Sequence, residues 1–425
     1  MKRILSAVVG GSADSWYISP ESYGAVGDGI ADDTQALQDA IVAAKLGTLC
    51  VKLTTGKIYR ITGAVTIDKS GFRLIGGNYL AHAQADGGYI KCDGATAMLK
   101  IEPTSGYLYR NIVNDVHFRG VNGALTAIKV TSAEEFAWQR VSAWGFGGKA
   151  YDFSGVHLSS FDWLVSTVNS IGVYLHNCAN NSFHKPNIYG SENQITTPTE
   201  AGFKFSGSSG NNMLIAPWFE NNRVALLFTN ALADLKCDQI TIIDGQFSAY
   251  FNEQPGTLAR IVKIVNETDA NKLNVRPIVF DRCMFSGSSS SGALPYFFEI
   301  NKNTCTASAS EIRGLFVIRN CMCAGTAPST AWALSDDANT RILWSDNLRG
   351  NAVAGETILS GSGSTIGLDC GGTFGLNSYS KHRGIVVVGQ QDAAAGVANG
   401  SIFEDTADGK LKYKNLAGSV QILAN

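Results

Sequence analysis

The stretch Tyr23-Gly-Ala-Val-Gly-Asp-Gly-Ile-Ala-Asp-Asp-Thr-Gln-Ala-Leu-Gln-Asp-Ala-Ile41 carries the clearest helix signal in a chain otherwise rich in strand patterns. Its glycines predict a tight turn before the helix. We expect Asp32 or Asp33 to be the N-cap, with Gln35 completing a capping box after Asp32, and Gly47 to end the helix. One apolar face repeats at helical spacing: Leu37, Ala40, Ile41 and Ala44.

Strand-forming residues follow this helix directly, first from 49 to 53 and then in Gly56-Lys-Ile-Tyr-Arg-Ile61. The order of glycine turn, paired aspartates, amphipathic helix and Gly-x-x-Tyr strand resembles the N-terminal start of pectate-lyase-like right-handed parallel β-helix proteins. Within this superfamily, the motif most resembles that of bacteriophage tailspikes and capsular polysaccharide depolymerases. The match covers residues 19 to about 62 in detail. It implies an all-β chain in which the helix, at about 32–46, caps a right-handed parallel β-helix.

The composition suits many short strands joined by turns. Charged residues make up 16% of the 425 residues, below a typical ~25%, and 46 residues are glycine. The net charge of −2 gives no basic field for nucleic acid, and no apolar run approaches the ~18 residues of a membrane span. The nine cysteines form no CxxC pair, so we expect buried thiols, folding in a reducing cell, no metal site and no cofactor.

A repeating strand motif predicts how the coils stack. We expect one internal column of residues, with a further coil near Val168: Phe118, Trp144, Tyr189, Phe219, Phe247, Phe285 and Cys323. The varying step between them is typical of a β-helix with loops of different length rather than a strict solenoid. A polar stack is expected at the preceding turn: Asn114, Asp244, Asp281, Asn320 and Asp346. Cys283 and Cys321 should also lie in register.

We expect an N-terminal arm at 1–18, the β-helix at 19–350 and a small β-rich region at 351–425. The apolar run of the first residues breaks at Gly10, which favours an arm over a signal peptide. Alternating residues around Asp408-Gly409 predict a β-hairpin. By resemblance, the C-terminal region implies trimerisation and the N-terminus attachment to a phage tail or baseplate protein. So short an arm fits either a truncated chain or a spike with a short attachment.

The resemblance implies a homotrimeric tailspike depolymerase of the virion. Such a protein folds in the bacterial cytoplasm and acts outside the cell on host capsule or O-antigen, without nucleic acid or membrane partners. No catalytic motif of the pectate lyases can be carried over, so the site must come from the residues themselves. Inverting glycoside hydrolysis needs two carboxyl groups ~6.5–9.5 Å apart. The aligned column puts Glu192 and Glu220 one coil and two residues apart, roughly 8 Å, which fits an inverting pair of a glycoside hydrolase, with Asp244 and Glu253 as reserves. The resemblance implies that such a hydrolase is endo-acting.

Residue types that bind sugars gather near this pair. The predicted substrate-binding residues are His184, Tyr189, Trp218, Arg223, Tyr250 and Glu253. For Trp218 and Tyr189, a place in the internal stack is the competing interpretation. A polysaccharide lyase using His184, Lys185 and Arg223 without a metal, or a spike that binds glycan without cleaving it, remain alternatives.

Overall fold

The structure is a computed structural model that describes most of the β-helix and parts of the C-terminal region. The described residues are 16–77, 88–190, 201–230, 235–251, 260–265, 273–289, 296–301, 315–323, 331–335, 341–345, 347–349, 357–361, 364–368, 390–391, 401–405, 410–414 and 420–424. Among them, no helix is long and apolar enough to cross a bilayer.

The chain enters the fold through the predicted turn and helix. A 3₁₀ turn, η1 (Pro20–Tyr23), and strand β1 (Asp28–Asp32) precede helix α2 (Thr34–Ala44). Asp33 is the N-cap, but the predicted capping box is wrong. The buried Asp33 carboxylate accepts hydrogen bonds from the N–H groups of Val26 and Gly27, at 2.7 and 3.1 Å, and so holds the glycine turn. Gln35 donates to Asp39 instead of to the cap.

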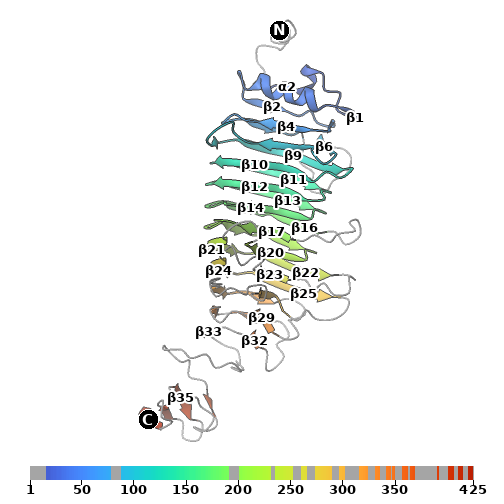
Figure 1. The fold of residues 1–425 in the computed structure, drawn as a ribbon. Coiled ribbons are helices and arrows are strands. Elements are labelled where there is room, and N and C mark those ends of the chain that lie inside the picture. The colour runs from blue at the N-terminus through green and yellow to red at the C-terminus, as the bar shows by residue number, and fades with distance from the viewer. Residues whose placement is uncertain are drawn as a thin grey trace.

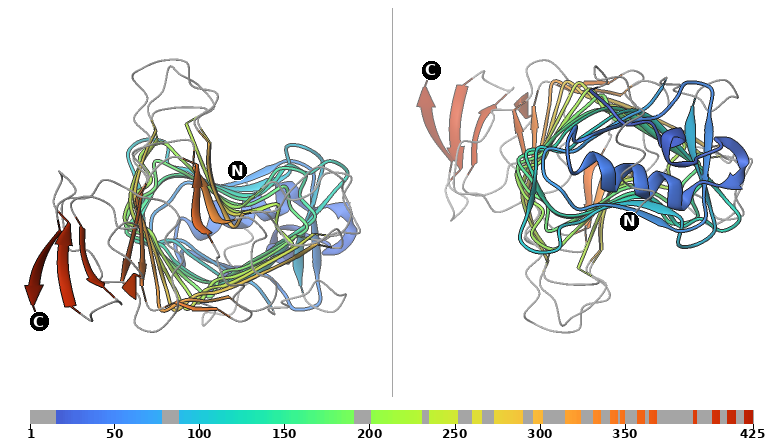
Figure 2. Two further views of the ribbon diagram at one scale, coloured as in Figure 1. Left: turned by 90° about the horizontal axis from the view of Figure 1, so that it is seen from below. Right: turned by 90° about the horizontal axis from the view of Figure 1, so that it is seen from above.

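Helix α2 covers the N-terminal end of the stack, as Figure 2 shows in the view from above. It ends at Ala44, and Gly47 lies in the turn that follows. The predicted apolar face is confirmed: Leu37, Ala40, Ile41 and Ala44 are all buried. The helix thereby keeps the first coil of the core from water.

Behind the helix, parallel strands stack along one axis and form a right-handed parallel β-helix (Figure 1). One face of each coil belongs to a 12-stranded sheet: β4 (Ala64–Ile67), β7 (Met98–Ile101), β8 (Leu108–Tyr109), β10 (Thr126–Glu134), β12 (Lys149–His157), β14 (Ile171–His176), β17 (Ala201–Ser206), β20 (Val224–Thr229), β23 (Arg260–Val265), β26 (Phe298–Asn301), β29 (Ala331–Ser335) and β32 (Thr357–Gly361).

The other faces form a 21-stranded sheet that bends around a corner. Besides β1 it contains β2 (Cys50–Lys52), β3 (Ile58–Ile61), β5 (Arg73–Ile75), β6 (Tyr89–Asp93), β9 (Ile112–Val121), β11 (Ala137–Trp144), β13 (Ser160–Thr167), β15 (Ser182–His184), β16 (Asn187–Tyr189), β18 (Met213–Ile215), β19 (Trp218–Glu220), β21 (Leu235–Ile243), β22 (Gln246–Phe251), β24 (Leu273–Asp281), β25 (Met284–Ser289), β27 (Leu315–Arg319), β28 (Met322–Cys323), β30 (Arg341–Ser345), β31 (Leu348–Arg349) and β33 (Ser364–Leu368).

At this corner each coil places one residue in the left-handed region, with φ between 49° and 58°: Asp115, Arg140, Trp163, Lys185, Ala216, Asp244, Arg282 and Asn320. Their N–H groups bond to the next coil, as Lys185 does to the Ile215 carbonyl at 2.7 Å. The predicted polar stack is therefore confirmed for Asp244 and Asn320. Asn114 and Asp281 lie one residue before the corner, because Asp115 and Arg282 are the left-handed residues in those two coils. Asp346 lies outside the described residues.

The internal column after the corner differs from the predicted one at two positions. Strand pairing aligns Phe118, Ala143, Ser166, Ile188, Phe219, Phe247, Phe285 and Cys323. The extra coil is present as β13. The predicted positions of Trp144 and Tyr189 are each wrong by one residue, since Ala143 and Ile188 are the internal residues. Since side chains alternate between the two sides of a strand, both lie on the outer side of the sheet.

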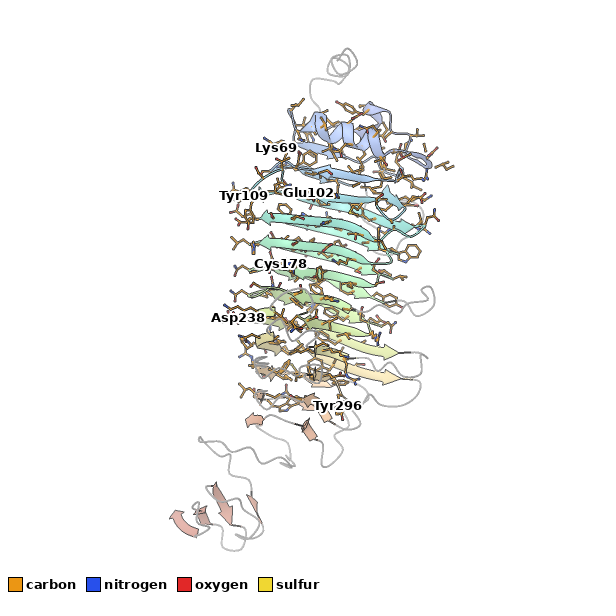
Figure 3. All side chains as sticks on the ribbon, viewed as in Figure 1. Lys69, Glu102, Tyr109, Cys178, Asp238 and Tyr296 are labelled. Atoms are coloured by element: carbon orange, nitrogen blue, oxygen red, sulfur yellow. The ribbon has the colours of Figure 1, made fainter. Side chains whose placement is uncertain are left out.

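Two kinds of stack stabilise the interior. Aromatic rings lie directly over one another, as in the pair Phe219 and Phe247, whose centroids are 5.1 Å apart. Such pairs contribute about 0.5–1.5 kcal/mol each beyond burial. The described free cysteines are buried, and Cys283 and Cys321 stack in register as predicted. Figure 3 labels one of these thiols, Cys178; its burial raises its pKa to about 12. The figure also labels Tyr109, whose side chain is 43% exposed.

The β-helix continues past the expected bound of residue 350, because β32 and β33 pair with β29 and β30. Beyond them, the C-terminal region contains a separate four-stranded sheet. Its strands are β34 (Gln390–Gln391), β35 (Ser401–Asp405), β36 (Lys410–Lys414) and β37 (Val420–Ala424). The predicted hairpin is confirmed, because β35 and β36 pair antiparallel with Asp405 opposite Lys410. The residues of its turn, including Asp408 and Gly409, lie outside the described part.

Candidate functional site

An outer column of side chains runs along the axis just beyond the corner. Strand pairing places Trp144, Thr167, Tyr189, Glu220 and Ser248 in successive coils at one register. Neighbouring members are therefore about 4.8 Å apart along the axis. We call these five residues the outer column. It contains two aromatic side chains, one carboxyl group and two aliphatic hydroxyl groups, which are types of side chain that contact sugars.

Tyr189, Trp218 and Glu220 form the centre of this surface. Trp218 lies two residues before Glu220 on the same side of β19 and is 47% exposed, whereas Tyr189 and Glu220 are half-buried. The Trp218 indole Nε1 donates to Glu220 Oε2 at 3.2 Å. This bond orients the carboxyl group, and Tyr189 lies beside it in the preceding coil. Tyr189 and Trp218 both lie on the outer side of the sheet, so their role in a surface site stays a prediction. The interpretation of Trp218 as a core residue is wrong.

The local sequence explains this arrangement. Ala216 turns the corner, and the buried Pro217 precedes the three residues Trp218, Phe219 and Glu220, whose side chains point out, in and out. Phe219 anchors the strand by stacking on Phe247. The buried Asn222 then donates from Nδ2 to the carbonyls of Ile188 and Glu220, at 2.9 and 3.1 Å, and fixes the backbone just after the carboxyl-bearing residue.

The other predicted carboxyl groups do not join this centre in the described residues. Asp244 lies at the corner, exposed, and its two oxygens accept from Arg282 at 2.8 and 3.3 Å. Glu192 and Glu253 lie outside the described residues. Tyr189 is level with Glu220, so the estimate of roughly 8 Å between Glu192 and Glu220 used an incorrect register.

The remaining predicted binding residues are spread around the coil. His184 lies on β15, before the corner, level with Asp162 and Ile215. Arg223 is exposed in the segment after β19. Tyr250 lies on β22, where only its backbone is described. Among the residues that the structure describes, no three His, Cys, Asp or Glu side chains gather as potential metal ligands.

Sequence reasoning missed the outward position of Trp144 and the part played by Arg119. The Arg119 guanidinium carbon lies 4.7 Å from the centre of the Trp144 ring, one coil away in the same register. The signal was the alternation Val141-Ser-Ala-Trp144, in which the small Ala143, not the bulky tryptophan, occupies the internal position.

Comparison with known proteins gives one curated relative and many similar folds. No family model matches the sequence. A capsule K30/K69-specific depolymerase of Klebsiella phage K64-1 is 26% identical over 269 residues, which are 60% of this chain and 31% of that protein. The chain thus spans about a third of the length of the curated relative it matches.

Solved structures share the fold at low sequence identity. The surface adhesin PfbA of Streptococcus pneumoniae has a TM-score of 0.57 at 13% identity, with 96% of this chain and 98% of the adhesin covered. The tailspike gp61 of Pseudomonas phage phi297 has a TM-score of 0.53 at 11% identity, with 80% and 76% covered. The chain is therefore a right-handed parallel β-helix protein whose sequence resembles a phage capsule depolymerase.

Proposed function

We propose that the protein is a phage tailspike depolymerase that binds and cleaves a bacterial surface polysaccharide, capsule or O-antigen. The observation that carries this proposal is the 269-residue similarity to a capsule-specific depolymerase. The fold alone does not distinguish an enzyme from a binding protein, since similar β-helices include an adhesin as well as a tailspike. The exposed Trp218 beside Glu220 supports a site that both holds and cuts glycan.

The proposed reaction is endo-acting hydrolysis of a glycosidic bond. One carboxyl group donates its proton to the leaving oxygen as the bond from that oxygen to the anomeric carbon breaks. The other accepts a proton from the water that forms the new bond to that carbon. We assign Glu220 to one of these roles. Glu192 and Asp244 are the candidates for the second, and Asp244 would have to leave its contact with Arg282.

Substrate would be held mainly by ring stacking. The half-exposed Trp218 and the neighbouring Tyr189 present apolar faces with polar edges, which suit the two faces of a pyranose. We place His184, Arg223, Tyr250 and Glu253 in the wider binding surface. Substitution of each to Ala should raise KM with little change in kcat.

The same proposal includes the assembly. We infer a homotrimer held in part by the four-stranded sheet within region 351–425, because an isolated sheet of short strands has little core of its own. The N-terminal residues would attach the spike to a phage tail or baseplate protein in the virion. Analytical ultracentrifugation should give three chains per particle, and a monomer would contradict the inference.

The test is incubation of the purified protein with Klebsiella capsular polysaccharides, beginning with types K30 and K69. New reducing ends without the ultraviolet absorbance of an unsaturated uronate are expected for hydrolysis. Such absorbance would show β-elimination instead, and binding without shortening would show a non-enzymatic spike. Glu220→Gln should abolish cleavage but keep glycan binding. Glu102→Gln is the matched control, because Glu102 is a partly exposed carboxylate that follows β7 of the 12-stranded sheet. Full activity of Glu220→Gln would remove Glu220 from the mechanism.

A further inference from the structure

The outer column continues past Trp144 toward the N-terminal end. Strand pairing places Arg119 level with Trp144 and Lys91 level with Arg119. We propose that Arg119, Lys91 and Trp144 form a subsite for an anionic sugar substituent, such as the carboxylate of a uronate. This inference rests on the proposed function and deepens it, because it makes the substrate an acidic polysaccharide.

Arg119 is a half-buried cation that forms no ion pair with a carboxylate among the described residues. Its guanidinium stacks on the Trp144 ring at 4.7 Å, and its buried Nε has no hydrogen-bond partner. Stacking of this kind holds the planar group in one orientation and leaves its edge for a carboxylate. The side chain as a whole is partly exposed, so a carboxylate would approach the solvent-facing part of the guanidinium and not its buried Nε.

The nearby carboxylates are engaged elsewhere. Asp93, on β6, accepts from Arg60 Nε at 2.6 Å. Asp115, at the corner of the same coil as Arg119, accepts from Arg140 Nε and Nη2 at 2.5 and 2.8 Å. Within the described residues, then, these acids balance other arginines. Neither acid pairs with Arg119, so its guanidinium remains available to a ligand.

Lys91 and His117 supply the rest of the polar surface. Lys91 Nζ donates to the Gly29 carbonyl at 3.0 Å, and an ammonium has two further N–H donors. His117 is 6% exposed and lies two residues before Arg119 on the outer side of β9. Its Nδ1 bonds to the Ser142 hydroxyl at 2.6 Å, while its buried Nε2 has no partner. Two unpaired polar nitrogens thus lie on one strand, at alternate residues.

The subsite lies in line with the proposed cleavage centre. From Arg119 the register runs through Trp144, Thr167 and Tyr189 to Glu220, four coil steps or about 19 Å. A glycan of several residues that follows the axis can therefore contact both ends. An anionic group at Arg119 would set which bond of the repeating unit lies at Glu220.

The experiment compares native polysaccharide with the same polysaccharide after carbodiimide activation and borohydride reduction, which turns its carboxylates into neutral hydroxymethyl groups. Binding is measured by calorimetry in the Glu220→Gln background, and initial cleavage rates are measured with Glu220 intact. The variants are Arg119→Gln, Arg119→Lys and, as a matched control, Arg73→Gln. Arg73 is an exposed arginine on β5, on the other side of the corner.

We expect Arg119→Gln to bind native polysaccharide about tenfold more weakly, as loss of a charge-assisted contact predicts. Arg119→Lys should fall between this variant and the parent, and Arg73→Gln should equal the parent. On reduced polysaccharide all variants should bind alike. Equal binding of native polysaccharide by Arg119→Gln and parent, or equal losses on native and reduced polysaccharide, overturns the subsite while cleavage persists. If no polysaccharide is bound or shortened by the parent protein, the proposed function itself fails.

Discussion

Replacing Asn212 by Ala should locally destabilise the β-helix more than any neighbouring surface change. Asn212 is 1% exposed and belongs to an internal ladder of amides. Its Oδ1 accepts from the backbone N and from Nδ2 of Asn181 in the previous coil, at 3.2 and 3.0 Å. Its Nδ2 donates to the carbonyls of Cys178 and Ser209, at 2.9 and 3.3 Å.

The magnitude follows from these four bonds. Each contributes a net ~0.5–1.5 kcal/mol, and a buried group left without a partner costs ~1–3 kcal/mol. Alanine cannot replace any of them, and both donors of Asn181 lose an acceptor. We therefore expect a cost of about 3–5 kcal/mol in the free energy of opening these coils. Such a cost would raise local amide exchange by a factor of roughly a hundred to a few thousand.

Hydrogen exchange followed by mass spectrometry is the assay, read in peptides that contain Asn181 and Asn212. Met213→Ala is the matched control, since Met213 follows Asn212 directly but is 38% exposed. Its effect should stay within about 0.5 kcal/mol. Unchanged exchange around Asn181 in Asn212→Ala would refute the assignment of ladder bonding to these two residues.

Three further predictions concern the cap, the outer column and pH. Asp33→Ala should lower the free energy of unfolding by about 2–4 kcal/mol, because two N–H groups of the turn lose their carboxylate acceptor. Denaturant midpoints measure this loss, and an unchanged midpoint would contradict the role of Asp33 in the cap. Trp218→Ala should raise KM for polysaccharide roughly three- to tenfold with a smaller change in kcat, and equal kinetics would argue against stacking. Burial and the charge of Arg119 lower the pKa of His117 from 6.5 to about 4. Between these values only the unfolded chain gains the proton, so stability should fall by up to about 3 kcal/mol on acidification. Above pH 6.5 this term vanishes. In His117→Gln the fall should be smaller, and parallel pH curves for variant and parent would contradict this origin.

The parts of the fold that follow local rules were predictable from sequence. The buried face of α2 follows from 3.6-residue spacing, and Cys283 and Cys321 share a register because their flanking residues repeat. The capping box failed because Asp33 bonds to a turn six and seven residues earlier. The spacing of Asp32 and Gln35 fits a capping box, but it gives no information on the bonds between Asp33 and the turn before the helix.

The site was less predictable because strand register has a period of two. Alignment on bulky aromatic residues chose Trp144 and Tyr189, whereas the internal column contains the preceding residue in each coil, Ala143 and Ile188. A slip of one residue moves a side chain from the core to the surface. The slip hid the outer column and altered the expected distance from Glu192 to Glu220.

The most direct test of the account is a crystal structure of the Glu220→Gln protein with a bound fragment of capsular polysaccharide several repeats long. We predict a glycan that follows the β-helix axis, stacks on Trp218 and Tyr189, and places a glycosidic oxygen beside residue 220. A glycan bound on the 12-stranded sheet, or one that crosses the coils at a distance from Trp218, would contradict the central claim.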